Sequence, residues 1–144
     1  MPVPIWWRVP WTFSRSSSST YSPSYAPGKA VDGLTTSLFS SNAGPSQWWE
    51  SSLPASGVLT QLQIVNRSDG YDSPAERENF QIQVSNSQVM SPGTFTVACS
   101  VGSTPLAYAS TFTCTLPPGP WQYVAVVKTD STELTFSEVR IFGQ

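Results

Sequence analysis

The chain has 144 residues, of which 11% are charged, and its formal net charge is −2 at pH 7. This balance argues against nucleic-acid binding, which needs a basic surface, and gives no reason to expect binding to an anionic membrane. No apolar run is long enough to span a bilayer. The length predicts one domain that buries about two-thirds of its unfolded surface. Histidine is absent, which removes the commonest general base and the commonest zinc ligand.

The first fifteen residues combine several prolines with Trp6, Trp7 and Trp11. They contain no continuous apolar stretch of the kind that a signal peptide needs. We expect residues 1–15 to form an arm that packs on or beside a domain spanning residues 16–144. The three tryptophans either cap the end of that domain or face a protein partner.

Alternation of apolar and polar residues, which is typical of half-buried β-strands, recurs through the rest of the chain. It predicts strands at Leu62–Ile64, Phe80–Val84, Phe95–Cys99 and Phe112–Leu116. The nearly continuous apolar run Tyr123–Lys128 is typical of a strand that is buried on both faces. Earlier in the chain, Trp48 and Trp49 are adjacent, so we expect their rings to point to opposite faces of a strand.

Near the C-terminus the alternation changes phase. Leu134 and Phe136 share one phase, and Val139 and Ile141 share the other, so a β-bulge is predicted around Ser137–Glu138. Turn signals such as Asp-Gly and Pro-Gly separate the predicted strands. Short strands between regular turns favour an all-β sandwich or jelly roll.

The two cysteines, Cys99 and Cys114, each lie in an alternating segment, in phase with large apolar residues. A disulfide between them would close a loop of hairpin size and contribute ~3 kcal/mol through the entropy of the unfolded chain. The alternative is a pair of reduced core cysteines, as is common in cytosolic proteins. Their matching positions in neighbouring predicted strands favour the disulfide.

Several segments, taken in order from Ser16 to Gly143, resemble the F-type lectin family, the fucolectin-like members of the discoidin (coagulation factor C-terminal) superfamily. These segments are SSSSTYSPSYAPGKAVDG, WWE, NRSD with a following ER, the cysteine pair, YVAVV and LTFSEVRIFG. The resemblance implies an eight-stranded antiparallel jelly-roll β-sandwich with a sugar site in loops at one end. It also implies binding of L-fucose without catalysis, and a calcium ion as structural support.

The family's sugar motif is an upstream histidine, then Arg-x-Asp, four residues and a basic residue. Here Arg67-Ser68-Asp69 matches the first part, but seven residues separate Asp69 from Arg77. The histidine is missing, and Ser40, Ser41, Asn42 or Gln47 lies in the region where it would fall. Gly70-Tyr71 stands where the family often has two adjacent cysteines.

The resemblance assigns a role to each of these positions. Arg67 and Arg77 would donate hydrogen bonds to sugar hydroxyls, Asp69 would orient them, and Tyr71 would stack on the sugar ring. In the alternative interpretation the two arginines pair with nearby acids and only hold the loop together, a kind of contact that contributes little to stability. Asn66 begins a glycosylation sequon, which we interpret as incidental because a glycan there would crowd Arg67.

The resemblance also implies a calcium site built from oxygen ligands. Asp32 and Glu138 would supply carboxylates, and Lys29, Leu34 and Ser137 would supply carbonyls. Ser40 or Ser41 would complete the shell. The alternative is that Asp32-Gly33 is only a turn and Glu138 only a surface residue.

We therefore expect a non-catalytic, carbohydrate-binding domain for fucose-type glycans or glycoproteins, located outside the cell or in the secretory pathway. The alternative is a structural or adhesion module that has lost sugar binding and contacts protein partners through the Trp-rich arm. A glycosidase needs two carboxylates across a cleft. Asp69 and Glu76 lie in one loop beside arginines that would keep both ionised, so we do not expect an enzyme.

Overall fold

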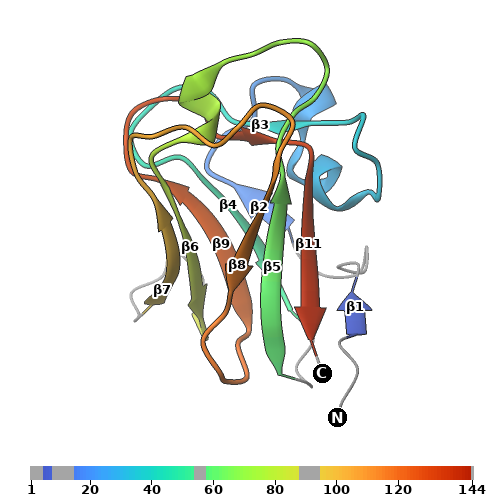
Figure 1. Cartoon of the computed structure of the whole chain (residues 1–144), viewed down its shortest axis with the longest axis vertical. Helices are drawn as coiled ribbons and strands as arrows, with labels where there is room; N and C mark the ends of the chain where they lie inside the picture. Colours follow the sequence, from blue (N-terminus) through green and yellow to red (C-terminus); the bar gives the residue numbers. More distant parts are fainter. Residues whose placement is uncertain (1–4, 8–14, 54–57, 88–94, 144) are drawn as a thin grey trace.

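The computed structural model describes residues 5–7, 15–53, 58–87 and 95–143. Two antiparallel β-sheets pack face to face, with the end of β11 at one end of the sandwich and most of the long connecting loops at the other (Figure 1). The strands are β1 (Ile5–Trp7), β2 (Arg15–Ser17), β3 (Phe39–Ser40), β4 (Trp48–Ser52), β5 (Leu59–Val65), β6 (Phe80–Ser85), β7 (Phe95–Val101), β8 (Thr111–Thr115), β9 (Tyr123–Lys128), β10 (Thr135–Phe136) and β11 (Glu138–Gly143). In the described part of the chain, three short 3₁₀ helices, η1 (Pro23–Tyr25), η2 (Pro27–Val31) and η3 (Pro74–Arg77), lie in the connecting loops.

The predicted all-β antiparallel sandwich is confirmed. One sheet has the strand order β2-β4-β9-β6-β7, the other β1-β11-β5-β8, and β10 pairs with β3 in a separate two-stranded ribbon. The eleven described strands exceed the expected eight, and four of them, β1, β2, β3 and β10, have only two or three residues. The alternating segments all form strands, and most of them place one apolar face between the two sheets. On β7, by contrast, the alternating residues Phe95 and Val97 are exposed, at 57% and 40%. No described helix is long and apolar enough to cross a membrane.

The core is filled by apolar side chains from both sheets, with an aromatic cluster near the end that carries the loops. Trp49 is fully buried, and its ring meets that of Phe136 edge-on at 5.9 Å, while Phe39 lies 5.3 Å from Phe136. The Trp49 indole Nε1 donates a hydrogen bond to the carbonyl of Pro27 at 3.0 Å, which ties η2 to the core. As predicted, Trp48 on the opposite face of the strand is less buried.

The predicted β-bulge around Ser137–Glu138 is wrong. The chain bends at Ser137 and passes from one set of strands to another. Before the bend, Phe136 pairs with Phe39 in the ribbon, and after it, Glu138 pairs with Val65 in the four-stranded sheet. The change of phase in the sequence therefore records a change of sheet rather than an extra residue within one strand.

At one edge of the four-stranded sheet, strand β1 pairs with β11, with Ile5 opposite Gly143. The prediction that the N-terminal tryptophans cap the domain or face a partner stays a prediction. The side chains of Trp6 and Trp7, and all of Trp11, lie outside what the structure describes.

The disulfide between Cys99 and Cys114 is confirmed, with an S–S distance of 2.07 Å. Cys99 lies on β7 of the five-stranded sheet and Cys114 on β8 of the four-stranded sheet. The bond therefore joins the two sheets covalently at one edge of the sandwich.

Replacing both cysteines with serine should lower the free energy of unfolding by ~3 kcal/mol, because the unfolded chain regains the entropy of an open fifteen-residue loop. Denaturant titration followed by tryptophan fluorescence measures this difference. The reduced wild-type protein is the matched control and should unfold at the same denaturant concentration as the variant. Unchanged stability in both would show that the disulfide does not constrain the unfolded chain.

Candidate functional site

A pocket of about 430 Å³ opens among the loops at one end of the sandwich. It combines aromatic rings, hydroxyl groups and charged side chains, as is typical of sites for small polar ligands. The described residues that line it are Tyr21, Tyr25, Leu38, Ser40, Ser41, Ala43, Arg67, Tyr71, Glu76 and Glu133. We call it the Arg67 pocket.

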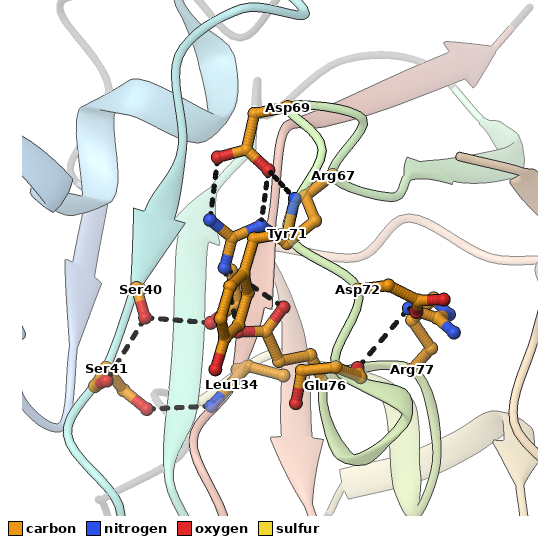
Figure 2. A network of polar contacts seen from close by, with 11 residues as sticks. Ser40, Ser41, Arg67, Asp69, Tyr71, Asp72, Glu76, Arg77 and Leu134 are labelled. Carbon is orange, nitrogen blue, oxygen red and sulfur yellow. Dashed lines mark hydrogen bonds and ion pairs between the residues drawn. The ribbon is translucent and has the colours of Figure 1, made fainter. Parts of the chain in front are cut away.

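Arg67 lies two residues after the end of β5, and its guanidinium group is held on two sides (Figure 2). Its Nε and Nη2 donate to the two carboxylate oxygens of Asp69 at 2.9 and 2.7 Å. Its Nη1 donates to Glu76 Oε1 at 2.9 Å and to Oε2 at 3.2 Å. A guanidinium has five N–H groups, so at least one on Nη2 is left for a ligand. Asp69 thus binds Arg67, which is only one of the two arginines that the sequence analysis expected it to orient.

A tight turn at Gly70, whose φ is +96°, lets Asp69 fold back onto Arg67. The hydrogen bond from Arg67 holds the pKa of Asp69 below its ordinary value. Both groups therefore remain charged, and Asp69 fixes the plane of the guanidinium before any ligand arrives.

Glu76 is the most deeply buried charged group in the wall of the pocket, at 4% exposure. It lies on η3 and faces Arg67. Burial raises the pKa of Glu76, and this effect outweighs the stabilisation of its charge by Arg67. Like-charge repulsion from Glu133 and Asp69 adds to the increase.

Tyrosine rings form the apolar parts of the pocket. Tyr71 lies over the Arg67 guanidinium, with its ring centroid 4.7 Å from Cζ, and remains 59% exposed. Figure 2 shows the Tyr71 ring in front of the guanidinium. On another part of the wall Tyr21 and Tyr25 meet edge-on at 5.8 Å, and Tyr21 is 68% exposed. Exposed ring faces of this kind can pack against the C–H groups of a sugar.

Arg77 does not line the pocket. Its Nη1 pairs with Asp72 at 2.7 Å, and its Nε donates to the carbonyl of Leu106 at 2.8 Å. Its side chain is only 6% exposed. Successive residues on a 3₁₀ turn point about 120° apart, so Glu76 faces the pocket while Arg77 faces the loop that contains Leu106. The two arginines of the sequence motif therefore do not converge on one cavity.

Two asparagines considered in the sequence also lie outside the pocket lining. Asn42 is exposed between two lining residues, and its backbone N–H donates to Ser19 Oγ at 3.0 Å. Asn66 is 2% exposed, and its amide donates to the carbonyl of Ser110 at 3.2 Å. The sequon at Asn66 is therefore closed to modification in the folded protein.

Other lining residues were not predicted to bind sugar. Tyr21 and Tyr25 come from a serine-rich stretch without periodicity, and Glu133 comes from a loop without a motif. Ser40 and Ser41, predicted as metal ligands, line the pocket instead. Their hydroxyls bond to Thr135 Oγ1 at 2.7 Å and to the backbone N–H of Leu134 at 2.9 Å.

The other predicted metal ligands lie around η2 and the start of β11. Glu138 is 3% exposed, and its Oε1 accepts a hydrogen bond from Gly33 N at 3.1 Å. The Ser37 hydroxyl lies 2.5 Å from Asp32 Oδ2 and 3.4 Å from the carbonyl oxygens of both Lys29 and Leu34.

A single hydroxyl hydrogen cannot serve three acceptors at once, and these oxygens are of the type that hard cations prefer as ligands. The hydroxyl of Ser137 is also buried and has no hydrogen-bond partner among the described residues. Within the same part of the chain, no three Asp, Glu, His or Cys residues cluster as a metal site. A cation here would depend on carbonyl and hydroxyl oxygens as well as the two carboxylates.

Lys128 binds the backbone of the 3₁₀ turn η3, which carries the pocket residue Glu76. It is 1% exposed at the end of β9, and its ammonium group donates to the carbonyls of Ala75 and Glu78 at 2.6 and 2.7 Å. These bonds hold η3, and with it Glu76, against the sheet. Burial lowers the pKa of Lys128, although Asp130, 3.5 Å away, partly offsets the effect.

The fold and part of the chain match known proteins. The sequence profile of the F5/8 type C family, described as a NedA-like, galactose-binding domain, matches residues 29–126. No curated protein shows a significant sequence match to the chain.

Three solved structures illustrate the likeness in fold. The f-lectin (fucolectin) from the serum of striped bass, Morone saxatilis, has a TM-score of 0.81 and 20% identity, covering 96% of this chain and 49% of that one. The family 32 CBM of C. perfringens NanJ, solved in complex with galactose, has a TM-score of 0.75 and 15% identity, with 97% and 99% covered. Chitosan-binding module 1 of the chitosanase/glucanase from Paenibacillus sp. IK-5 has a TM-score of 0.70 and 20% identity, with 90% and 94% covered.

Replacing Lys128 with methionine should lower the free energy of unfolding by about 1–3 kcal/mol, because the partly buried carbonyls of Ala75 and Glu78 lose their donor. Denaturant titration measures this loss. Lys29→Met is the matched control, since Lys29 is the only other lysine and its side chain is less buried. A Lys128→Met variant as stable as wild type would mean that the desolvation of the ammonium cancels its two hydrogen bonds.

Proposed function

This chain belongs to the F5/8 type C family, the discoidin superfamily expected from its sequence, and we propose that it is a non-catalytic carbohydrate-binding module whose ligand site is the Arg67 pocket. One observation carries the proposal. A guanidinium held rigidly by Asp69 and Glu76 lies in a pocket that also offers hydroxyl groups and exposed tyrosine rings.

These groups suit a saccharide for physical reasons. A sugar presents hydroxyls in fixed directions on one side and C–H groups on the other. A guanidinium held in place donates charge-assisted hydrogen bonds without losing further rotamer entropy, and a ring face packs against the C–H groups. The buried Glu76 and the hydroxyls of Ser40 and Ser41 can accept hydrogen bonds in return.

The choice of sugar is a finer question. Proteins that share this fold are described with fucose-type, galactose and chitosan ligands, so the sheets themselves do not set specificity. The motif Arg67-Ser68-Asp69 makes fucosylated glycans the first class to test. Arg77, the second arginine of the fucose motif, is engaged elsewhere, so any fucose binding would depend on Arg67 alone.

Two further parts of the proposal concern catalysis and location. Asp69 and Glu76 hold one guanidinium between them rather than facing each other across a cleft, which supports a binding role without hydrolysis. The Cys99–Cys114 disulfide suits an oxidising compartment, and we propose an extracellular or secretory-pathway location. The adhesion alternative, with a protein partner at the Trp-rich arm, stays a prediction.

We also propose a structural calcium ion bound by Asp32, Glu138, the carbonyls of Lys29 and Leu34, and the hydroxyl of Ser37, with Ser137 nearby. Its charge would satisfy oxygens that now compete for one hydroxyl hydrogen. It would thereby fix η2 against β11.

Replacing Arg67 with alanine should weaken saccharide binding about 10-fold to 100-fold, since a hydrogen bond to a charged group contributes about 1.5–3 kcal/mol. A glycan array that includes fucosylated and galactosylated sugars, followed by calorimetry on the best ligand, measures this change.

Arg67→Lys keeps the charge but loses the fork, and should bind almost as weakly while staying folded by circular dichroism. Arg140→Ala, on β11, is the control and should bind like wild type. Full binding by both Arg67 variants would place the site elsewhere.

Calcium should raise the melting temperature of the wild-type protein, and a chelator should reverse the effect. At a hundredfold excess over the dissociation constant, the gain is about 2.7 kcal/mol. Asp32→Asn should abolish the response, whereas Asp72→Asn, at an exposed acid outside the cation site, should retain it. A wild-type melting temperature that ignores calcium would contradict the proposed site.

A further inference from the structure

The Arg67 pocket has more negative than positive charge in its wall. One arginine and two glutamates line it. Arg67 is already neutralised by Asp69 on one side and by Glu76 on another. Glu133 is half-buried and makes no hydrogen bond or ion pair with any described residue. The pocket therefore holds one carboxylate that has no ion-pair partner among the described residues, and its charge acts on the buried carboxylate of Glu76.

The excess negative charge extends through the loops around the pocket. Residues 66–79 and 128–134 contain six of the nine acidic side chains but only three of the seven basic ones, a formal charge of −3. The remainder of the chain has three acidic and four basic side chains. The two segments lie against each other, since Lys128 bonds to the carbonyls of Ala75 and Glu78, and Asn79 bonds to Asp130 at 3.1 Å.

Acidic, neutral and positively charged saccharides would interact differently with this pocket. An acidic sugar would find its natural partner, Arg67, already engaged and would approach Glu76 and Glu133. A neutral sugar would use the remaining N–H of Arg67 and the hydroxyl groups without relieving any repulsion. A sugar with an ammonium group would donate to Glu133 and would reduce the repulsion between Glu133 and Glu76.

We propose that the Arg67 pocket selects a saccharide with a protonated amine, of the glucosamine type, and that Glu133 receives the ammonium group. This inference rests on the proposed carbohydrate-binding function and names its ligand class. An ammonium–carboxylate pair in a partly exposed site is worth about tenfold in affinity.

Isothermal calorimetry with a glucosamine trisaccharide and with the same trisaccharide after N-acetylation tests the proposal, because acetylation removes the charge and keeps the sugar rings. At an ionic strength of about 0.15 M, long-range attraction is screened. The wild-type protein should bind the free amine about tenfold more tightly than the acetylated form. Glu133→Gln should remove this preference and leave the acetylated form bound as before.

Glu78→Gln is the matched control, since Glu78 belongs to the same acidic region but does not line the pocket. It should keep the preference. Equal losses in Glu133→Gln and Glu78→Gln would overturn the proposal in favour of general attraction to an acidic surface. Equal binding of the two trisaccharides by wild type, with both lost in Arg67→Ala, would overturn the charge selection but keep the carbohydrate-binding function. No binding of either trisaccharide or of fucosylated glycans would contradict both proposals.

Discussion

The arrangement of the loops at the pocket end of this sandwich depends on the pairing of buried charged groups. Glu76 is almost fully enclosed, and a carboxylate removed from water is stable only if it is paired or protonated. Arg67 supplies the pair, Asp69 fixes Arg67 from the other side, and Lys128 holds the helical turn that carries Glu76. The same bonds that satisfy these charges thus set the shape of the pocket. Most of the charges in this loop therefore bind one another.

The sheets below it were largely predictable. Alternation of apolar and polar residues identified β6 and β8, and the cysteines in phase with their apolar neighbours indicated the disulfide, since both signals arise from burial of one strand face. The bend at Ser137 changes the phase of the alternation, and a β-bulge would have the same effect on the sequence pattern. Only the pairing partners of Phe136 and Glu138 in the structure distinguish a bend from a bulge. The sequence places Lys128 at the end of an apolar strand. It does not indicate the carbonyl groups that bind the Lys128 ammonium group in the folded protein.

The site was predictable only in part. Arg67 and Asp69 lie two residues apart, so local geometry brings them together, and the motif found them. Whether Arg77 faces the pocket depends on the orientation of the 3₁₀ turn that carries it. The seven-residue spacing between Asp69 and Arg77 does not determine that orientation. Tyr21 and Glu133 reach the pocket through long-range folding, and neither stands in a pattern. A motif therefore located the pocket, whereas tertiary structure determined which of its residues face inward.

The central claim is that a saccharide binds in the Arg67 pocket, and side-chain NMR tests it most directly. The Arg67 Nε–H resonance should be visible in a ¹⁵N correlation spectrum, because its hydrogen bond to Asp69 protects it from exchange with water. Titration with the best glycan ligand should shift this resonance together with the backbone signals of Ser41, Tyr71 and Glu133, and should leave the edge strand β7 unchanged. Shifts confined to β7, with Arg67 unaffected, would contradict the account.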